Sequence, residues 1–323
     1  GNDPVWQAEK AKYSPNKNAD NRNVRFRDWD NMQYWFRAVE KFAPWVNKVH
    51  FVTYGHLPKW LNTNNPKLNI AKHSDFIPKE YLPTFSSQPI ELNLHRIKGL
   101  AERFVYFNDD MFLLRPVKRE LFFAGKDCLP TDFAITSTIS TTTKEDMMPF
   151  IKLNCVTILN GHFDKKEQMK KHFSKWVNLA YGWNALRNLI FYGQHRFKGF
   201  ANNHLAFSFL KSEYEDIWEK EYEALADTSS HKFRSKLDLD NWLIRYWQLT
   251  RGNFYPIGRH VKGKVYEIYN GVEQNQELFK VIENQTMPMI CINDNENVDF
   301  EPMKERIKQA FDKILPEKSS FEK

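Results

Sequence analysis

The apolar positions along the chain recur with the periods of both helices and strands. A helical spacing over residues 32–42 follows the capping sequence Asp28–Asn31 and ends before Pro44. Three short apolar runs predict strands over residues 48–55, 68–71 and 104–107. A second helical spacing begins at Pro89 and predicts a helix over 89–100. This order of elements, with short connections, predicts an α/β sheet of nucleotide-binding type.

The remaining segments predict a loop at the start and helices in the second half. Residues up to about Asn23 are polar and predict a loop, and the Ser/Thr-rich run 136–143 predicts a strand or an exposed loop. Further helices are predicted over 165–181, 205–218, 238–249 and 303–314, with a late strand over 289–292. We therefore expect one domain over residues 1–323, with a helical subregion at about 160–250.

Composition and charge narrow the class of protein. Hydrophobic residues are 41% and aromatic residues 15% of the chain, which allows a sizeable core and argues against bulk disorder. No apolar run approaches the roughly 18 residues of a membrane span. The three cysteines lack metal-type spacing, and their odd number argues against a disulfide scaffold, so we expect a reducing, cytoplasmic setting.

The net charge of +7 favours anionic partners such as phosphorylated sugars, nucleotides or an acidic membrane face. The Lys and Arg residues are scattered and form no nucleic-acid motif, so we expect no nucleic-acid partner. The segment 165–181 is basic as well as amphipathic. This pattern is typical of an ordinary surface helix, and it also occurs in helices that contact a membrane or an acceptor.

Two predicted strands end in acidic residues. The run 103–107 leads into Asn108, Asp109 and Asp110, and the late strand ends near Asp294. Open α/β sheets build their sites at the carboxyl ends of strands, and two adjacent carboxylates there are suited to hold a divalent cation against nucleotide phosphates. The alternative is that both endings are polar turns, which Asn and Asp favour.

Two later segments combine groups that bind phosphate. His204 lies at the start of the predicted helix 205–218, where a helix N-terminus favours anions; it is a candidate general base, or a simple polar cap. The run 228–234 places hydroxyls, His231 and Arg234 together, which suits phosphate, although a solvated loop is an equal alternative.

Other candidates are weaker. Arg25 and Arg27 form a basic pair next to acids, which is equally consistent with surface ion pairs. His95 shares a helical face with Glu91, and a structural role at the edge of the core is as consistent with this pattern as a functional role. A Gly-rich phosphate loop, a zinc pattern and a Gly-x-Ser-x-Gly elbow are all missing from the sequence. The residues alone thus support an α/β domain with acids suited to a cation and basic clusters suited to phosphate.

Together these segments resemble the Stealth family of sugar-phosphate transferases, which includes bacterial capsular polysaccharide phosphotransferases and the catalytic subunit of the animal N-acetylglucosamine-1-phosphotransferase. The blocks that carry the resemblance are 25–53, 82–110, His204 with 228–234, and 291–294. In the third block, Leu205 and Ala206 follow His204 where the family often has an apolar residue and Pro. The family's opening block is a strand that ends in a sequence of Trp-Val-Asp-Gly type. Residues 1–4 of this chain resemble only the tail of that block. We therefore expect the strand and its terminal Asp to be missing from this chain.

The resemblance implies a mixed sheet with flanking helices, similar to nucleotide-sugar transferases of glycosyltransferase A type. It also implies transfer of a sugar 1-phosphate, usually from a UDP-sugar, to a hydroxyl of an acceptor oligosaccharide or polysaccharide. The product is a phosphodiester and UMP leaves. Two alternatives remain: a metal-dependent glycosyltransferase that releases UDP, and a non-catalytic carbohydrate-binding module.

Within this reaction, we expect Asp109 and Asp110 to hold Mg²⁺ or Mn²⁺ on the diphosphate. Arg234 is expected to stabilise the phosphoryl oxygens. His204 or Asp294 removes the acceptor proton, with a slight preference for His204.

The donor is expected to be positioned by a second set of residues, with Ser86 and Ser87 at a helix start facing it. This set comprises Arg25, Ser86, Ser87, His95, Arg96, Asn108 and His231. Attachment to a membrane, if the enzyme works there, is expected to be peripheral on the cytoplasmic face.

Overall fold

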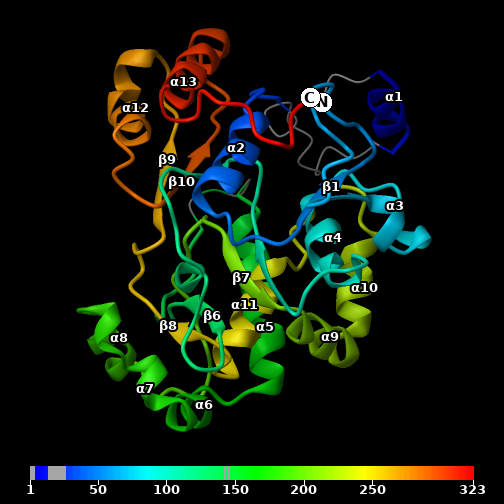
Figure 1. Ribbon diagram of the computed structural model, residues 1–323. Helices are drawn as coiled ribbons and strands as arrows, with labels where there is room; N and C mark the ends of the chain where they lie inside the picture. Colours follow the sequence, from blue (N-terminus) through cyan, green and yellow to red (C-terminus); the bar gives the residue numbers. More distant parts are fainter. Residues whose placement is uncertain (1–3, 14–26, 142, 144–145) are drawn as a thin grey trace.

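The computed structural model describes residues 4–13, 27–141, 143 and 146–323, and within them the chain is a mixed α/β protein (Figure 1). Short strands occupy the middle of the molecule and helices flank them. The strands are β1 (Val49–Thr53), β2 (Leu68–Lys72), β3 (Arg103–Tyr106), β4 (Met111–Leu113), β5 (Phe123–Ala124), β6 (Leu129–Asp132), β7 (Phe207–Leu210), β8 (Tyr255–Pro256), β9 (Gly263–Glu267) and β10 (Met289–Asn293).

In the described part of the chain, the strands form four small sheets. β1 and β2 are parallel, with Val49 opposite Leu68, and β3 and β7 are antiparallel. The other two sheets are mixed: β10 lies between antiparallel β4 and parallel β9, and β6 lies between antiparallel β5 and parallel β8. The predicted mixed α/β class is confirmed, but the strands are divided among several sheets.

Thirteen α-helices accompany these strands in the described residues. They are α1 (Pro4–Tyr13), α2 (Met32–Phe42), α3 (His73–Phe76), α4 (Ser87–Leu92), α5 (Met148–His162), α6 (Lys165–Lys171), α7 (Phe173–Trp176), α8 (Asn184–Ile190), α9 (Lys211–Lys220), α10 (Tyr222–Ser230), α11 (Asn241–Thr250), α12 (Gln276–Glu283) and α13 (Phe300–Ile314). Short 3₁₀ turns are η2 (Lys79–Tyr81), η3 (Leu94–Arg96), η4 (Arg119–Leu121), η5 (Leu179–Tyr181) and η6 (Val272–Asn275). No helix in the described ranges is long and apolar enough to cross a membrane.

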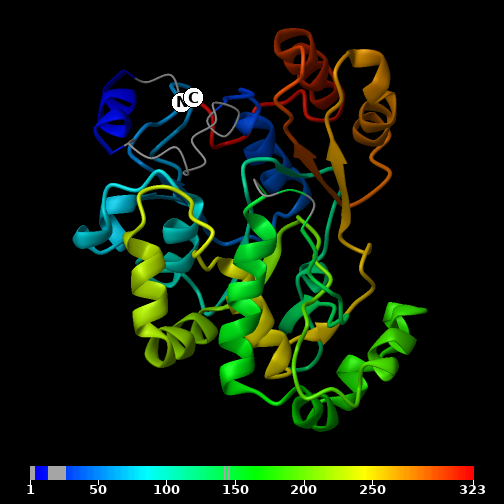
Figure 2. The ribbon, with the colours of Figure 1, turned by 180° about the vertical axis from the view of Figure 1, so that it is seen from behind.

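Two hydrophobic clusters organise the molecule. The first joins α2, β4, β10, α12 and α13, where Phe112 packs against Phe311 with ring centres 4.8 Å apart. The second joins α5, α9, α11 and β7 and contains the buried Trp247. Figure 2 shows α5 (green) lying across α11 (gold) in this second cluster. Burial of these apolar faces is the main force that holds the helices to the strands.

Several predicted elements match the structure. The helical spacing over 32–42 forms α2, and the final spacing forms α13. The predicted helix 238–249 begins at Asn241, because the side chain of Asp240 accepts a hydrogen bond from the Trp242 N–H and caps the helix.

Four predictions differ from the structure. The segment that was predicted as a polar loop at the start of the chain includes a helix, α1. The ring of Trp6 in α1 lies edge-on to the ring of Phe85, with ring centres 5.7 Å apart. Residues 14–23 of this segment lie outside the described residues. The predicted helix 205–218 is a strand, β7, followed by α9, because the short apolar run 207–210 is buried beside β3. Periodicity alone does not separate a short buried strand from a helix segment. The spacing over 89–100 is divided into α4 and η3, and the spacing over 165–181 into α6, α7 and η5.

Candidate active site

A cavity of about 820 Å³ lies between the two hydrophobic clusters. It receives side chains from the carboxyl ends of β3 and β10, from the starts of α4, α5 and α11, and from the loops before α2, β7 and α11. Eight of the sequence-predicted residues line it: Ser86, Ser87, Asn108, Asp109, Asp110, His204, Arg234 and Asp294. The structure thus brings together segments that are widely separated in the sequence.

The Asn108–Asp110 segment is both a turn and part of the cavity wall. It connects β3, which pairs with β7, to β4, which pairs with β10. The Met111 N–H donates to the Asn108 carbonyl, and the Asp110 carbonyl accepts from the Ile292 N–H at 2.8 Å. These backbone bonds fix the two carboxylates at the point where the chain passes from one sheet to another.

The two carboxylates differ in their surroundings. The Asp109 side chain is accessible from the cavity, but the protein around it displaces much of the water that would solvate its carboxylate. This desolvation, with the charge of Asp110, raises the pKa of Asp109 to about 6. Oδ1 of Asp110 is buried and has no hydrogen-bond partner among the described residues. An unpartnered buried carboxylate oxygen is costly, and a bound cation would satisfy it.

His204 lies in a bend before β7, and not at a helix start as the sequence pattern predicted. Its Nε2 is 3.3 Å from Oδ2 of Asp110 and 3.4 Å from Nδ2 of Asn108. Burial alone lowers the pKa of His204, but the hydrogen bond to Asp110 and the charges of Asp110, Glu91 and Asp109 outweigh it and raise that pKa. The helix-terminus effect expected from the sequence therefore does not apply, and a carboxylate sets the protonation of this imidazole.

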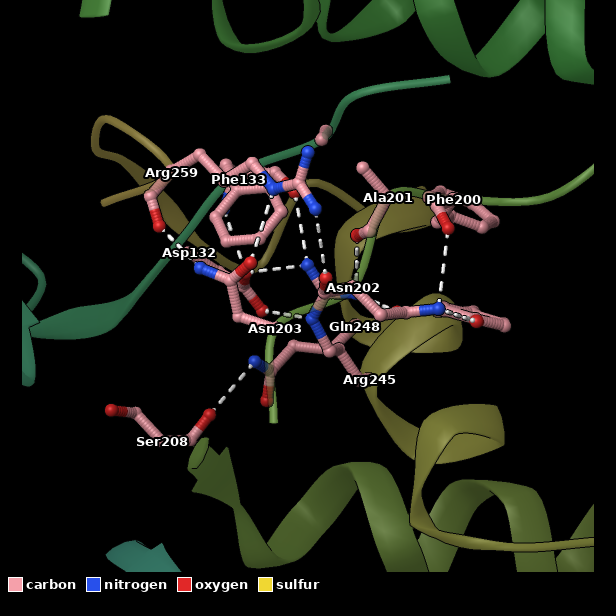
Figure 3. Close-up of polar contacts among 12 residues, drawn as sticks. Asp132, Phe133, Phe200, Ala201, Asn202, Asn203, Ser208, Arg245, Gln248 and Arg259 are labelled. Atoms are coloured by element: carbon pink, nitrogen blue, oxygen red, sulfur yellow. Dashed lines mark hydrogen bonds and ion pairs between the residues drawn. The ribbon is translucent and has the colours of Figure 1, made fainter. Parts of the chain in front are cut away.

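A buried polar network holds the segment before His204 in place (Figure 3). Arg245 of α11 is 1% exposed, and its guanidinium donates to both carboxylate oxygens of Asp132 at 2.8 Å. The same group donates to the Ala201 carbonyl at 3.2 Å and to Oδ1 of Asn202 at 2.6 Å. Arg259 then donates to Oδ1 of Asn203 at 3.0 Å. Ala201 and Asn202, ahead of His204, are thus bonded to the buried Arg245, and Asn203 is bonded to the exposed Arg259.

Asp294 lies beyond the end of β10 and already has partners. Trp29 donates from Nε1 to its Oδ2 at 3.1 Å, the Asn295 N–H donates to its Oδ1, and Arg27 Nε lies 3.6 Å away. Burial raises the pKa of Asp294, although Arg27 and Trp29 oppose this. With both oxygens engaged, Asp294 is less suited than His204 to take up a proton.

Arg234 approaches the cavity from the loop between α10 and α11. Its guanidinium lies 3.4 Å from Oγ of Ser87 and 3.7 Å from Sδ of Met148. Ser86 is the N-cap residue of α4, but its hydroxyl bonds to Gln88 and makes no cap bond to the backbone. A guanidinium beside a hydroxyl at the cavity wall is suited to hold phosphate oxygens.

Arg27, a weaker candidate, also lines the cavity, whereas His95, Arg96 and His231 do not. His95 is buried between Tyr214 and Trp218, with ring centres 5.7 and 5.8 Å away, and burial lowers the pKa of His95 to about 3. Arg96 covers the Trp218 ring at 4.7 Å. These two residues belong to the core edge, which was the sequence alternative for His95.

His231 bonds to the buried Asp238 at 2.6 Å, in a contact that orders the loop carrying Arg234. Arg25 lies outside the described residues.

The structure adds cavity residues that the sequence reasoning did not select. Glu91 and Asp240 are buried carboxylates, and Lys152 lies 4.3 Å above the Trp242 ring. Burial and the charge of Glu91 raise the pKa of Asp240 to about 7. In the sequence, Asp240 lies within the predicted helix 238–249 and Glu91 shares a helical face with His95, so neither pattern pointed to a cavity.

The charge of the cavity limits what it can bind. Among the described residues, eight carboxylates line it: Asp28, Glu91, Asp109, Asp110, Asp240, Glu267, Asp294 and Glu296. Arg27, Lys152 and Arg234 are the lining Lys and Arg residues in the same set. A diphosphate alone would be repelled by this excess of negative charge, whereas a diphosphate accompanied by a divalent cation would not.

Comparison with known proteins places this geometry in context. The family model for conserved region 2 of the Stealth proteins matches residues 25–129, which include the Asn108–Asp110 turn and the two serines at the start of α4, Ser86 and Ser87. The chain is 44% identical over 305 residues to the capsular polysaccharide phosphotransferase WcwK of Streptococcus pneumoniae, covering 94% of this chain and 88% of that protein. It is 40% identical over 329 residues to the receptor polysaccharide phosphotransferase WefC of Streptococcus gordonii (100% and 96% covered), and 38% identical over 326 residues to the exopolysaccharide phosphotransferase cps2G of Lactiplantibacillus plantarum (100% and 94% covered).

Proposed function

The chain belongs to the Stealth family of polysaccharide phosphotransferases, and on this premise we propose that it transfers a hexose or N-acetylhexosamine 1-phosphate from a UDP-sugar to a hydroxyl of an acceptor sugar. The product is a phosphodiester in a capsular polysaccharide or exopolysaccharide. The acceptor oxygen attacks the phosphorus that carries the sugar, the bond between the two phosphates breaks, and UMP leaves with its electrons. The anomeric carbon is untouched, so its configuration is retained.

The observation that carries the proposal is the convergence of three segments on one cavity. Asp109 and Asp110 lie in the turn between β3 and β4, His204 precedes β7, and Arg234 enters from the loop between α10 and α11. A carboxylate pair, an imidazole and a guanidinium are the groups that phosphoryl transfer uses for cation binding, proton removal and charge stabilisation.

The residues present fit a divalent cation. Oδ1 of Asp110 is buried without a partner in the described part of the chain, Asp109 faces the cavity, and the excess of acids calls for positive charge. Carboxylate oxygens suit Mg²⁺ or Mn²⁺. Cys291 and His204 also lie near Asp110, but burial and the neighbouring acids raise the pKa of the Cys291 thiol, which disfavours the thiolate. When bound by Asp109 and Asp110, the cation would offset charge on the diphosphate and on the departing UMP.

His204 is the proposed general base. Its Nε2 faces Asp110, and the surrounding carboxylates stabilise the imidazolium that forms when it takes the acceptor proton. The Arg245 network fixes the backbone ahead of it, which holds the ring orientation.

Arg234 is the proposed ligand of the phosphoryl oxygens, because its fork can bind two oxygens at once. Ser86 and Ser87 contribute hydroxyls to the same wall, and the amide nitrogen of Asn108 lies 3.4 Å from Nε2 of His204. The proposal retains three further expectations: a likeness to glycosyltransferase A-type enzymes, one catalytic domain, and a cytoplasmic location with peripheral membrane association.

Isotopic labelling tests this function. A UDP-sugar labelled at the phosphate next to the sugar is incubated with the protein, Mg²⁺ and acceptor oligosaccharides. Label in the saccharide product supports sugar-phosphate transfer. If the sugar is transferred and all the label stays with the nucleotide, the reaction is glycosyl transfer and the proposal is wrong.

A further inference from the structure

A row of large apolar side chains lies on the outer side of the segment 179–190. Leu179 is 96% exposed and Trp183 is 90% exposed, and Leu186, Leu189 and Ile190 are also exposed. We call these five residues the apolar ridge. Trp183, Leu186 and Ile190 follow one another at intervals of three and four, so they share one face of α8. In both ribbon views α8 reaches away from its neighbours at the edge of the molecule (Figures 1 and 2).

The ridge belongs to an ordered part of the fold. Asn188, on the opposite face of α8, is completely buried and accepts a hydrogen bond from the Thr136 N–H at 2.8 Å. Its amide donates to the carbonyls of Ala134 and Trp176 at 2.6 and 2.5 Å. The buried Trp176 and Tyr181 anchor the same segment from α7 and η5. The exposed apolar face is therefore held outward by a fixed inner face.

The segment around the ridge is strongly basic. Between residues 164 and 198 the sequence has eight Lys or Arg residues and two acids. The exposed basic side chains are Lys166, Lys170, Lys171, Arg196 and Lys198. One of the two acids, Asp164, is already engaged with His195 at 2.6 Å. The ridge thus belongs to a basic stretch of the chain, and five of the Lys and Arg side chains of this stretch, which we call its basic border, face solvent.

We propose that the apolar ridge and its basic border form a peripheral docking surface for a membrane that contains anionic lipid. Protruding aliphatic side chains with a tryptophan suit the boundary between headgroups and acyl chains, and basic residues alongside are attracted to anionic headgroups. A protein partner would need a complementary groove for this protruding row, whereas a fluid bilayer accommodates it without one. The surface is independent of the reaction proposed above, because none of its residues lines the cavity.

Vesicle binding by the full chain tests the proposal. Sedimentation is measured with sucrose-loaded vesicles of phosphatidylcholine alone and of phosphatidylcholine with phosphatidylglycerol. The wild type is expected to bind the anionic vesicles preferentially. The double variant Trp183→Ser, Ile190→Ser is expected to lose about tenfold or more in affinity, because two apolar side chains no longer enter the lipid. Leu237→Ser removes a side chain that is 72% exposed outside the ridge and is expected to bind as the wild type does.

Two further variants separate the parts of the surface. Lys170→Glu with Lys171→Glu is expected to abolish the preference for phosphatidylglycerol. Trp183→Phe keeps the apolar contact but removes the indole, so it is expected to bind while losing fluorescence quenching by lipids with brominated acyl chains. These side chains are exposed, and circular dichroism checks that each variant is folded.

Three outcomes would overturn the proposal: no binding to either vesicle, equal binding by the wild type and the double variant, or a dimer in solution that Trp183→Ser dissociates. The last would assign the ridge to a second copy of the chain.

Discussion

His204 and Asp110 are 94 residues apart in the sequence, yet Nε2 of the imidazole lies 3.3 Å from Oδ2 of the carboxylate. The other oxygen of Asp110 is buried without a partner among the described residues. One carboxylate thus orients the candidate base with one oxygen and leaves its second oxygen for a cation. In the proposed mechanism, this would link proton removal and cation binding in a single side chain.

Replacing His204 with Gln should slow turnover strongly while leaving the fold intact. Gln keeps a hydrogen-bonding group near the Nε2 position but cannot take up a proton at neutral pH. General base catalysis typically contributes about 10²–10⁴-fold, so we expect a loss in that range in steady-state rates. His260→Gln, at an exposed position, is the matched control and should keep the wild-type rate. A fall of less than about tenfold in His204→Gln would remove His204 from this role.

Asp109→Asn and Asp110→Asn should each weaken cation binding. Removing a carboxylate charge weakens the attraction to Mg²⁺ or Mn²⁺, and Asn supplies only one oxygen ligand. We expect chelation to abolish activity of the wild type and added Mg²⁺ to restore it. In titrations followed by thermal unfolding, Mn²⁺ should raise the melting temperature of the wild type and of the exposed control Asp127→Asn, but raise it less in both variants. An identical Mn²⁺ response in all four proteins would contradict the assignment.

Arg234→Lys tests the guanidinium without removing its charge. Lys loses the fork that binds two oxygens, so turnover should fall by about 10²–10³-fold. The change is measured as turnover at saturating donor, with circular dichroism as the check on folding. Arg119→Lys, whose side chain is 70% exposed and paired with the adjacent Glu120, should leave the rate unchanged. Wild-type turnover in Arg234→Lys would show that positive charge alone suffices at this position.

Asp240→Asn should change how stability depends on pH. Burial and the charge of Glu91 raise the pKa of Asp240 to about 7, from an ordinary value of 3.8. The folded chain therefore keeps a proton that the unfolded chain releases between about pH 4 and pH 7, so the contribution of Asp240 to the free energy of unfolding falls as pH rises through this window.

Asn stays neutral and retains an oxygen to cap α11, so the free energy of unfolding of Asp240→Asn should fall less between these pH values. Chemical denaturation at several pH values measures this difference, with Asp127→Asn as the control that follows the wild type. Parallel profiles for the wild type and Asp240→Asn would contradict the assignment.

The sequence predicted local elements well where one pattern dominated. Each of these elements has a cap, a Pro or a polar ending in the sequence that marks where it begins or ends. They are the helix α2 and the strands β1, β2, β3 and β10. The same strand endings led to Asp109, Asp110 and Asp294, because acids after a buried strand lie at the edge of a sheet. These predictions needed no information from distant parts of the chain.

The remaining features depend on tertiary contacts. Phe207–Leu210 is a strand only because β3 lies beside it, and the position of His204 follows from that pairing. His95 shares a sequence pattern with functional residues, but Tyr214 and Trp218 enclose it. Glu91 and Asp240 become cavity residues through the packing of α4 and α11, which no local pattern reveals.

The nucleotide product tests the central claim most directly. The protein is incubated with Mg²⁺, a panel of UDP-sugars and acceptor oligosaccharides, and UMP and UDP are then separated. We predict that the wild type releases UMP only when the acceptor is present. The variant Asp110→Asn is expected to release no UMP. Acceptor-dependent release of UDP in place of UMP would show that the enzyme transfers the sugar without its phosphate and would contradict this account.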